Sequence, residues 1–370
     1  MNVLTLNGGS SSLKVALFAG DPPSRIAARS FERVTDFTAA FEDLRGWLEP
    51  HGGLDGLLGV GHRIVHGGSR FEEAVRITPE VIVELRRLAA LDPTHLPAEI
   101  ALVDAVARRA PRLSQVACFD TAFHRTMPRV ARMLPIPHRY DAMGVQRYGF
   151  HGLSYAFLMQ ELARVAGAQT ARGRVILAHL GNGASLCACK DGRSVDTTMG
   201  FTPAGGIMMG TRPGDLDPGV LVHLLRAERL DADALDDLLN RRSGLLGVSG
   251  TGSDVRDLLA REAEDPRAAE ALALFSYRAK KEIGAMAAAL GGVDTLVFAG
   301  GIGENAPALR ARIAGGLEHL GVALDPARNA ANAAVVSAPE SRATVRVMHT
   351  DEESMIAHET LRVLAVHPTE

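Results

Sequence analysis

The sequence predicts an α/β fold made of two similar halves, because strand and helix patterns alternate along the whole chain. A strand, a glycine turn and a second strand occur twice, as VLTLNGGSSSLKVAL from Val3 and as VILAHLGNGASLCAC from Val175. Aligning Ser12 with Ser185 places Gly8 on Gly181, at a shift close to half the chain length. This repeat indicates a duplicated domain. If the halves face each other, both glycine turns are expected at one cleft.

The first hairpin has apolar residues at every second position on either side of its glycine turn. The same period places Ser10, Ser12 and Lys14 together, opposite the apolar side chains. A Walker loop has its lysine at the start of a helix, whereas Lys14 lies inside the second strand, so this is not a Walker loop. The two hydroxyls and the ammonium could hold a terminal phosphate, or they could form a solvated strand face beside a serine-rich turn.

Apolar spacing and capping residues predict the remaining elements. In the first half, helices are expected over 38–49, 79–90 and 97–109, and strands over 57–65 and 113–119. In the second half, helices are expected over 217–227, 254–262, 268–290, 306–318 and 352–365, strands over 295–299 and 345–347, and a loop over 300–305. Thr78–Pro79 is a typical helix start, and Gly291–Gly292 a typical helix end.

The composition is that of an ordinary globular protein, with a net charge of −3, 46% hydrophobic and 22% charged residues. It has no basic excess that would indicate nucleic-acid binding. The chain contains no run of about 18 apolar residues and does not begin with a signal-peptide pattern, so we expect a cytosolic protein. Cys118, Cys187 and Cys189 lack metal-ligand spacing, and the last two are expected as small core residues on one strand face.

Three glycine-rich segments carry features typical of anion binding. GGIGEN, residues 300–305, follows a buried strand, and the N–H groups at the start of the next helix favour an anion. Its spacing is not that of a dinucleotide fingerprint. Arg63 ends an apolar strand beside glycines, and Arg212 lies in a loop rich in glycine and proline. A guanidinium matches the two oxygens of a carboxylate or phosphate, although a structural salt bridge explains most arginines.

Three further residues lie at the ends of predicted elements, and a carboxylate that closes a core strand is where open α/β sheets place ligand chemistry. Asp120 closes a strand, His151 precedes a helix, and Glu352 begins the last helix. Each also has an ordinary explanation, since an isolated histidine is commonly a structural hydrogen-bond donor and an acidic residue is favourable in a first helical turn.

Together these segments resemble the acetate/propionate kinase family of the actin/hexokinase/Hsp70-like phosphotransferase superfamily. The matching motifs run in order from residue 2 to the end: LNGGSSSLK, GHRIVHGG, DPTHLP, CFDTAFH, RYGFHG, HLGNGAS, MGFTPAGGIMMGTRPGDLDP, SDVRDL, FAGGIGEN and TDEESMIA. The resemblance implies duplicated ribonuclease H-like domains that face each other across a nucleotide cleft. Residues 1–149 plus 354–370 would form the acyl-substrate lobe, and residues 150–353 the nucleotide lobe. It also implies a homodimer, ATP as co-substrate, and Mg²⁺, with Mn²⁺ as a substitute.

The resemblance also implies roles for individual residues. The catalytic residues would be Asp120, His151 and Arg212, and the substrate-binding residues Arg63, Val65, Thr94, Phe150 and Pro203. The ATP-binding residues would be Lys14, His179, Leu180, Gly181, Asn182, Gly183, Asp254, Val255, Arg256, Gly301, Ile302, Gly303, Glu304 and Asn305, and the metal-binding residues Asn7 and Glu352. Thr94 stands where the family usually has leucine, Asp351 where it has asparagine, and Pro213 where it has serine.

The implied reaction is reversible phosphorylation of acetate by ATP to give acetyl phosphate. A carboxylic acid with a pKa of ~4.3 is already ionised at neutral pH. We therefore expect Asp120 to position Arg63 or a Mg²⁺-bound water rather than to remove a proton. The alternatives are a propionate kinase, with Thr94 as the feature in question, a sugar or glycerol kinase of the same superfamily, and a non-catalytic ATP-switched protein.

Overall fold

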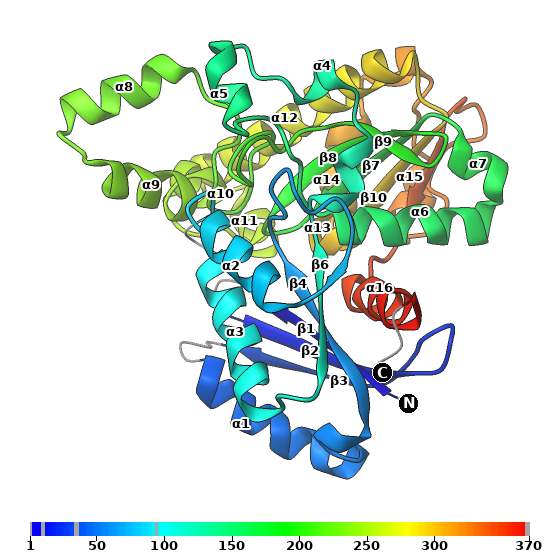
Figure 1. The fold of residues 1–370 in the computed structure, drawn as a ribbon. Coiled ribbons are helices and arrows are strands. Elements are labelled where there is room, and N and C mark those ends of the chain that lie inside the picture. The colour runs from blue at the N-terminus through cyan, green and yellow to red at the C-terminus, as the bar shows by residue number, and fades with distance from the viewer. Residues whose placement is uncertain (1, 9–11, 33–36, 93–94, 367–370) are drawn as a thin grey trace. The chain divides into compact units, whose positions relative to one another are not determined.

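The computed structural model describes residues 2–8, 12–32, 37–92 and 95–366 (Figure 1). The chain divides into two compact units. Unit 1 contains Met1–Arg125, Phe150–Phe157 and Asp351–Glu370, and unit 2 contains Thr126–Gly149 and Leu158–Thr350. The domain boundaries at residues 150 and 354 stay a prediction, and the two units are described separately.

Unit 1 is built on a six-stranded sheet in the order β3-β2-β1-β4-β6-β5. Strand β1 pairs antiparallel with β2, which pairs antiparallel with β3, whereas β4 runs parallel to β1 and β6 runs parallel to β4. The short β5 is antiparallel to β6. The strands are β1 (Asn2–Gly8), β2 (Ser12–Ala19), β3 (Ser24–Glu32), β4 (Leu57–Ile64), β5 (Val75–Arg76) and β6 (Ser114–Phe119).

Helices cover both faces of this sheet (Figure 1). Helices α1 (Phe37–Leu48) and α3 (Leu96–Arg109) pack on the leucine and valine side chains of β1, β2 and β4, and α2 (Pro79–Leu88) packs on α3. Helix α16 (Glu352–Val366) covers the opposite face, where Ala357 contacts Val3, Ala16 and Phe18. This is the hairpin face on which the sequence places Lys14. Ala16 and Phe18 on that face are buried, Lys14 is exposed, and Ser10 lies outside the described residues.

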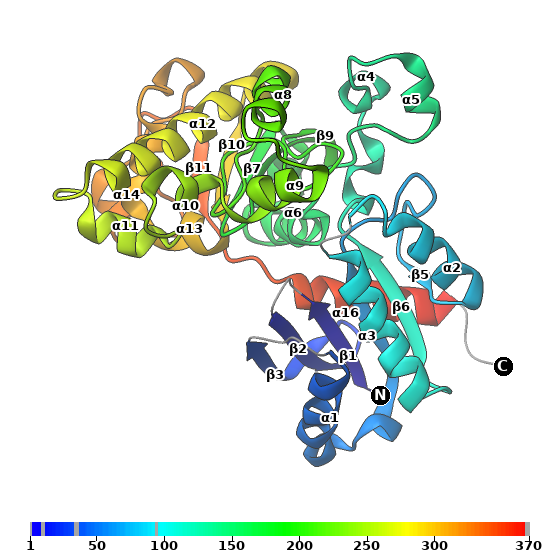
Figure 2. The ribbon, with the colours of Figure 1, turned by 90° about the vertical axis from the view of Figure 1, so that its left-hand side faces the viewer.

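Unit 2 repeats the strand connectivity of unit 1. Its sheet has the order β11-β10-β7-β8-β9, with β8 antiparallel to β7 and to β9, and with β10 parallel to both β7 and β11 (Figure 2). The strands are β7 (Val175–Leu180), β8 (Ala184–Lys190), β9 (Arg193–Thr197), β10 (Thr295–Ala299) and β11 (Thr344–Val347). They correspond in order to β1, β2, β3, β4 and β6, which confirms the predicted duplication.

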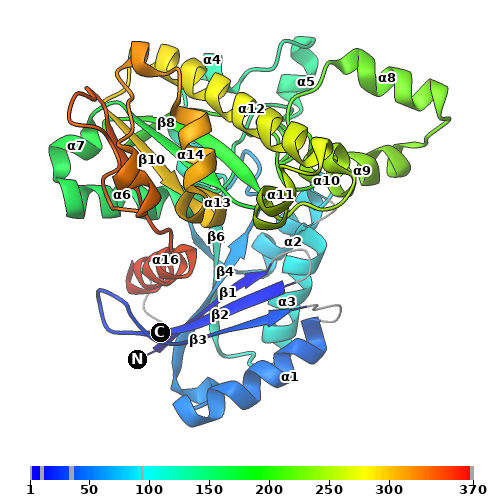
Figure 3. The same cartoon turned by 180° about the vertical axis from the view of Figure 1, so that it is seen from behind.

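The long helix α12 (Pro266–Leu290) packs along β8 and β9 (Figure 3). It ends at the predicted Gly291, whose φ of 73° and N–H bonds to Ala287 and Ala288 close its last turn. The other helices are α4 (Arg129–Arg132), α5 (His138–Ala142), α7 (Ala168–Arg172), α8 (Pro218–Ala227), α9 (Ala232–Arg241), α10 (Gly244–Ser249), α11 (Val255–Arg261), α13 (Gly300–Asn305), α14 (Pro307–Ala314) and α15 (Pro326–Ala330). Helix α6 (Gly152–Ala166) begins in unit 1 and continues in unit 2.

Two expectations about the segment after β10 are wrong. Residues 300–305 form helix α13 instead of a loop, because the Glu304 side chain accepts a hydrogen bond from the Gly300 N–H and replaces a missing helical acceptor. The next helix ends at Ala314 rather than at residue 318, because Gly315 has a non-helical ψ of 127° and Gly316 has a φ of 87°.

Two smaller expectations are confirmed. Cys187 and Cys189 are fully buried on one face of β8, with their sulfur atoms 3.6 Å apart and no disulfide between them. Thr78 caps α2 by accepting a hydrogen bond from the Val81 N–H, with Pro79 in the first turn. Within the described part of the chain, no helix combines the length and the apolar character needed to cross a bilayer.

Candidate active site

A buried ion pair lies where two parallel strands of unit 1 end. Arg63 is near the end of β4, and Asp120 directly follows β6 and donates its N–H to the Ile64 carbonyl at 3.0 Å. The Arg63 Nε and Nη2 atoms donate to Asp120 Oδ2 at 3.1 and 2.6 Å. The structure thus brings together two residues that the sequence placed at separate strand ends.

The surroundings of Arg63 keep it positively charged. Burial lowers the pKa of its guanidinium, but the charges of Asp120, Glu352 and Glu99 raise it above its usual value. Burial raises the pKa of Asp120, and the ion pair with Arg63 opposes that change. The Arg63 side chain is 14% exposed and that of Asp120 only 1%, so Arg63 remains the more accessible member of the pair.

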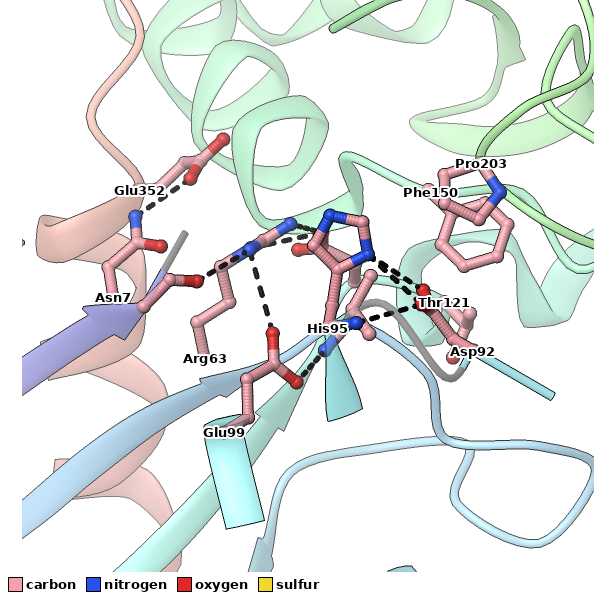
Figure 4. A network of polar contacts seen from close by, with 12 residues as sticks. Asn7, Arg63, Asp92, His95, Glu99, Thr121, Phe150, Pro203 and Glu352 are labelled. Carbon is pink, nitrogen blue, oxygen red and sulfur yellow. Dashed lines mark hydrogen bonds and ion pairs between the residues drawn. The ribbon is translucent and has the colours of Figure 1, made fainter. Parts of the chain in front are cut away.

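Arg63 has two further neighbours. Its Nη1 donates to the Gly8 carbonyl at 3.2 Å and lies 3.7 Å from Oε1 of Glu99 (Figure 4). The other Glu99 oxygen accepts a hydrogen bond from the Val65 N–H at 2.9 Å. Sequence reasoning missed Glu99. The sequence did carry one signal of its burial. Glu99 lies on the same face of α3 as Leu96 and Ile100, which are buried.

The residues predicted to bind a metal ion are in contact with each other. Asn7, near the end of β1, donates from Nδ2 to Glu352 at 3.0 Å and to Glu353 at 3.1 Å (Figure 4). Lys14 is the cross-strand partner of Asn7 in the β1–β2 hairpin. Asp351, which caps the first turn of α16, forms an ion pair with Arg25.

This donor set fits Mg²⁺ bound mainly through water and phosphate oxygens. Carboxylate and amide oxygens are hard ligands, and Mg²⁺ in phosphotransferases commonly uses only one or two of them. Oδ1 of Asp120 is buried with no hydrogen-bond partner among the described residues, so a polar group could be accommodated there. No cluster of three or more His, Cys, Asp or Glu side chains suited to a metal occurs in the described ranges.

His151 is held close to Asp120 by the glycine that follows it. The Gly152 N–H donates to the Asp120 carbonyl at 2.9 Å, and a Cβ on Gly152 would lie only 2.1 Å from that oxygen. His151 itself has a φ of 59°, in the left-handed region that few non-glycine residues adopt. His124 fixes this segment by donating from Nε2 to the Phe150 carbonyl at 2.9 Å.

The predicted acyl pocket is described in part. Val65 and Phe150 are both buried, and the ring of His66, next to Val65, contacts the Phe150 ring edge-on at 5.5 Å. Thr94 lies outside the described residues. Pro203 belongs to unit 2, where its carbonyl accepts a hydrogen bond from Arg212 Nη1 at 2.7 Å.

Two of the predicted nucleotide segments lie side by side in unit 2. Strands β7 and β10 pair in parallel, so the turn after Leu180 and the start of α13 occur at the same sheet edge. Gly300 has a φ of 75°, and a Cβ there would lie 2.7 Å from the Leu180 carbonyl. The sequence therefore needs glycine at this position. The close approach of Gly300 to Leu180 brings the predicted segments 179–183 and 301–305 together.

The third predicted nucleotide segment begins α11. Asp254 caps this helix by accepting the Arg256 N–H, and Val255 is buried. The Arg256 side chain hydrogen-bonds to Asp254 and lowers the pKa of that carboxyl to about 2, while the Arg256 side chain remains 88% exposed.

Arg310 is a buried residue that sequence reasoning also missed. It is fully buried, and its guanidinium donates to the carbonyls of Gly303 and Glu304 at 2.8 and 2.9 Å. Its other donors reach Asn329 and the Asn332 side chain at 2.6–2.8 Å. Arg310 therefore satisfies the carbonyls at the end of α13 and fixes that helix. No sequence signal distinguished it from the exposed arginines.

Comparison with known proteins agrees with these features. The model of the acetokinase family matches residues 48–358. An acetate kinase from Rhodopseudomonas palustris (strain TIE-1) is 45% identical, with 98% of each chain covered, and a propionate kinase from Citrobacter rodentium is 41% identical, with 98% of this chain and 96% of that protein covered. The crystal structure of Porphyromonas gingivalis acetate kinase superposes with a TM-score of 0.90 at 39% identity, covering 98% of this chain and 99% of that one. The chain therefore belongs to the acetokinase family, whose members are phosphotransferases with a duplicated actin/hexokinase-like fold.

Proposed function

We propose that this protein transfers the γ-phosphoryl group of ATP reversibly to acetate, giving ADP and acetyl phosphate. The observation that carries the proposal is the arrangement around Arg63. A charged guanidinium, aligned by Asp120, lies beside the buried Val65 in unit 1. A cation next to an apolar side chain suits a short carboxylate, which has an anionic head and a small apolar tail.

Asp120 is proposed to position Arg63 and not to act as a base. Acetate is already ionised at neutral pH, so the reaction has no proton to remove. Both hydrogen bonds from Arg63 to Asp120 end on one carboxylate oxygen, which fixes the guanidinium plane. The remaining problem is charge, because the acetate anion must approach a polyanionic phosphate, and Arg63 is proposed to neutralise the carboxylate.

Unit 2 is proposed to bind the nucleotide. The turn at 179–183, together with α13, would hold the phosphates, and the start of α11 would hold the nucleoside. Lys14 in unit 1 would contact a phosphate, and His151 and Arg212 would stabilise charge on the transferred phosphoryl group. One arginine in such a role is worth about 10³–10⁵ in rate. Asn7 and Glu352 would hold Mg²⁺ or Mn²⁺, which would neutralise phosphate charge when bound.

Propionate is the second candidate substrate. Thr94 replaces the leucine that the family usually has in the acyl pocket, and one close relative is named a propionate kinase. The reaction chemistry would be the same. Only the preference for a two-carbon or three-carbon acid would differ, by about the 1–3 kcal/mol that one methylene is worth in an apolar pocket.

One assay tests the substrate class. The protein is incubated with Mg-ATP, hydroxylamine and either acetate, propionate or glycerol, because only acyl phosphates are trapped as hydroxamates. Hydroxamate with acetate, and less with propionate, is the expected result. A larger kcat/KM with propionate would favour the second candidate, and no hydroxamate with either acid would reject the function.

A homodimer in the cytoplasm is also proposed. Helix α8 exposes Val220, Val222 and Leu225, and none of its residues is buried. An apolar helix surface of this kind commonly marks an interface between protein chains. Sedimentation analysis across a range of protein concentrations would show a dimer if this proposal is right and a monomer if it is wrong.

A further inference from the structure

A second acidic side chain, besides Asp120, reaches Arg63. Glu99 extends from α3 and is 4% exposed. Its Oε2 accepts the Val65 N–H at 2.9 Å, and its Oε1 lies 3.7 Å from Arg63 Nη1 (Figure 4). Glu99 therefore connects the proposed carboxylate-binding cation to the backbone of the proposed acyl pocket.

The outer oxygen of Glu99 has unused hydrogen-bonding capacity. Oε1 is buried and has no hydrogen-bond partner among the residues that the structure describes, because 3.7 Å is too long for a hydrogen bond. A buried carboxylate oxygen without a partner is costly, whereas a carboxylic acid could donate its proton to an incoming anion. The position of Oε1 beside Arg63 places that donor where the substrate carboxylate would bind.

The charges that face Glu99 decide whether its protonated or its ionised form is favoured. Arg63 comes from β4 and Asp120 from the end of β6, while Asp92 and His95 precede α3. Asp92 accepts hydrogen bonds from the backbone and the ring Nδ1 of His95. The pKa of Glu99 is raised to about 8, mainly by burial and also by the charges of Asp120 and Asp92, while Arg63 and the Val65 N–H oppose the rise.

A bound substrate anion would add to the negative charge around Arg63. Asp120 already forms an ion pair with Arg63. If Glu99 were also ionised, a substrate carboxylate would be a further anion beside the carboxylates that already act on Arg63. Like charges within a few ångströms favour the protonated form of one of them.

We propose that Glu99 is a positioning residue for Arg63 and Val65, and that it holds a proton on Oε1 when the carboxylate substrate is bound. This inference rests on the proposed function of the same site. Its consequence is that Glu99 ionisation competes with substrate binding. Above a pH of about 8, the KM for acetate should rise about tenfold for each further pH unit, while the KM for ATP should not share this change.

The experiment compares kcat/KM for acetate and for ATP between pH 6 and 9.5. The variants are Glu99→Gln, which is neutral and keeps an oxygen for the Val65 N–H, Glu99→Ala, and Glu72→Gln, an exposed control in the same unit. The wild type and the control should lose kcat/KM for acetate above pH 8. The kcat/KM of Glu99→Gln for acetate should remain flat over this pH range. Glu99→Ala should raise the KM for acetate about tenfold or more at pH 7, with little change in the KM for ATP.

Several outcomes would overturn the inference. One is a wild-type profile for acetate that is flat through pH 9, and this result needs no variant to fold. Another is a Glu99→Gln profile that falls as the wild type does. Equal losses for acetate and ATP in Glu99→Ala would indicate a purely structural role. Absence of acyl phosphate from the wild type at every pH would instead reject the proposed function.

Discussion

Replacing Asp120 by asparagine tests whether its charge is needed to hold Arg63. Both hydrogen bonds from Arg63 end on Oδ2, at 3.1 and 2.6 Å, so one amide oxygen can accept both in the same geometry. What is lost is the charge assistance, because a hydrogen bond to a charged group is worth about 1.5–3 kcal/mol and a neutral one about 0.5–1.5 kcal/mol. Two weakened bonds lose ~2 kcal/mol together, which corresponds to a fall of about 30-fold in kcat/KM for acetate. Asp120→Ala removes both bonds and should cost about 3–5 kcal/mol.

The assay measures initial rates of ADP formation at saturating Mg-ATP, with acetate varied. Asp104→Asn is the matched control, because Asp104 forms an exposed ion pair with Arg86, and such pairs contribute about 0–1 kcal/mol. Circular dichroism confirms that each variant is folded. If Asp120→Asn keeps kcat/KM for acetate within about threefold of wild type, the charge of Asp120 is not what positions Arg63.

Three further predictions follow from buried contacts. In Gly152→Ala the new Cβ must move away from the Asp120 carbonyl, so we expect a loss of stability of about 1–3 kcal/mol and a kcat at least about tenfold lower, measured by denaturant unfolding and initial rates. Arg310→Met leaves the last carbonyls of α13 without donors, so the KM for ATP should rise about tenfold while the KM for acetate stays unchanged. Glu99 has a folded-state pKa of about 8 against an ordinary value of 4.5, so its contribution to the free energy of unfolding is complete below pH 4.5 and is lost as the pH rises to 8. Glu99→Gln should therefore gain as much as ~5 kcal/mol relative to wild type over that window, and equal pH dependence in urea unfolding of the two proteins would contradict this sign.

Much of the fold could be predicted because its signals are local. The two hairpins show period-two apolar residues around a glycine turn, and α12 has a cap at each end. Strand β3 was missed because the apolar residues of Ser24–Glu32 do not recur at every second position, and its pairing comes from β2. Helix α13 was missed because its glycines favour a loop locally, and the contacts of Glu304 and Arg310 that fix it form only in the folded chain.

The candidate site divides in the same way. Arg63 and Asp120 were noticed because each ends an apolar strand, a pattern visible in a few residues. Glu99 and Arg310 look like ordinary polar positions of helices, and their importance depends on partners 34 and 19 residues away. The apolar period of α3 places Glu99 on the buried face of that helix, but no periodicity reports which partners an enclosed acid or base will meet when distant elements pack together.

Arg310 and Arg63 show how the same side chain is adapted to different tasks. Among the described residues, Arg310 donates only to carbonyl and amide oxygens. These acceptors are neutral and belong to the protein itself, so Arg310 can fix α13 but has no reason to attract a ligand. Arg63 instead faces Asp120, which is hydrogen-bonded to it, and Glu99, which is near but not bonded. A cation that binds an anion in every turnover needs one permanent counter-charge to keep it in place while the site is empty. A second counter-charge that can be neutralised allows the substrate to enter without an excess of negative charge. Protonation of Glu99 neutralises its charge with no movement of the chain.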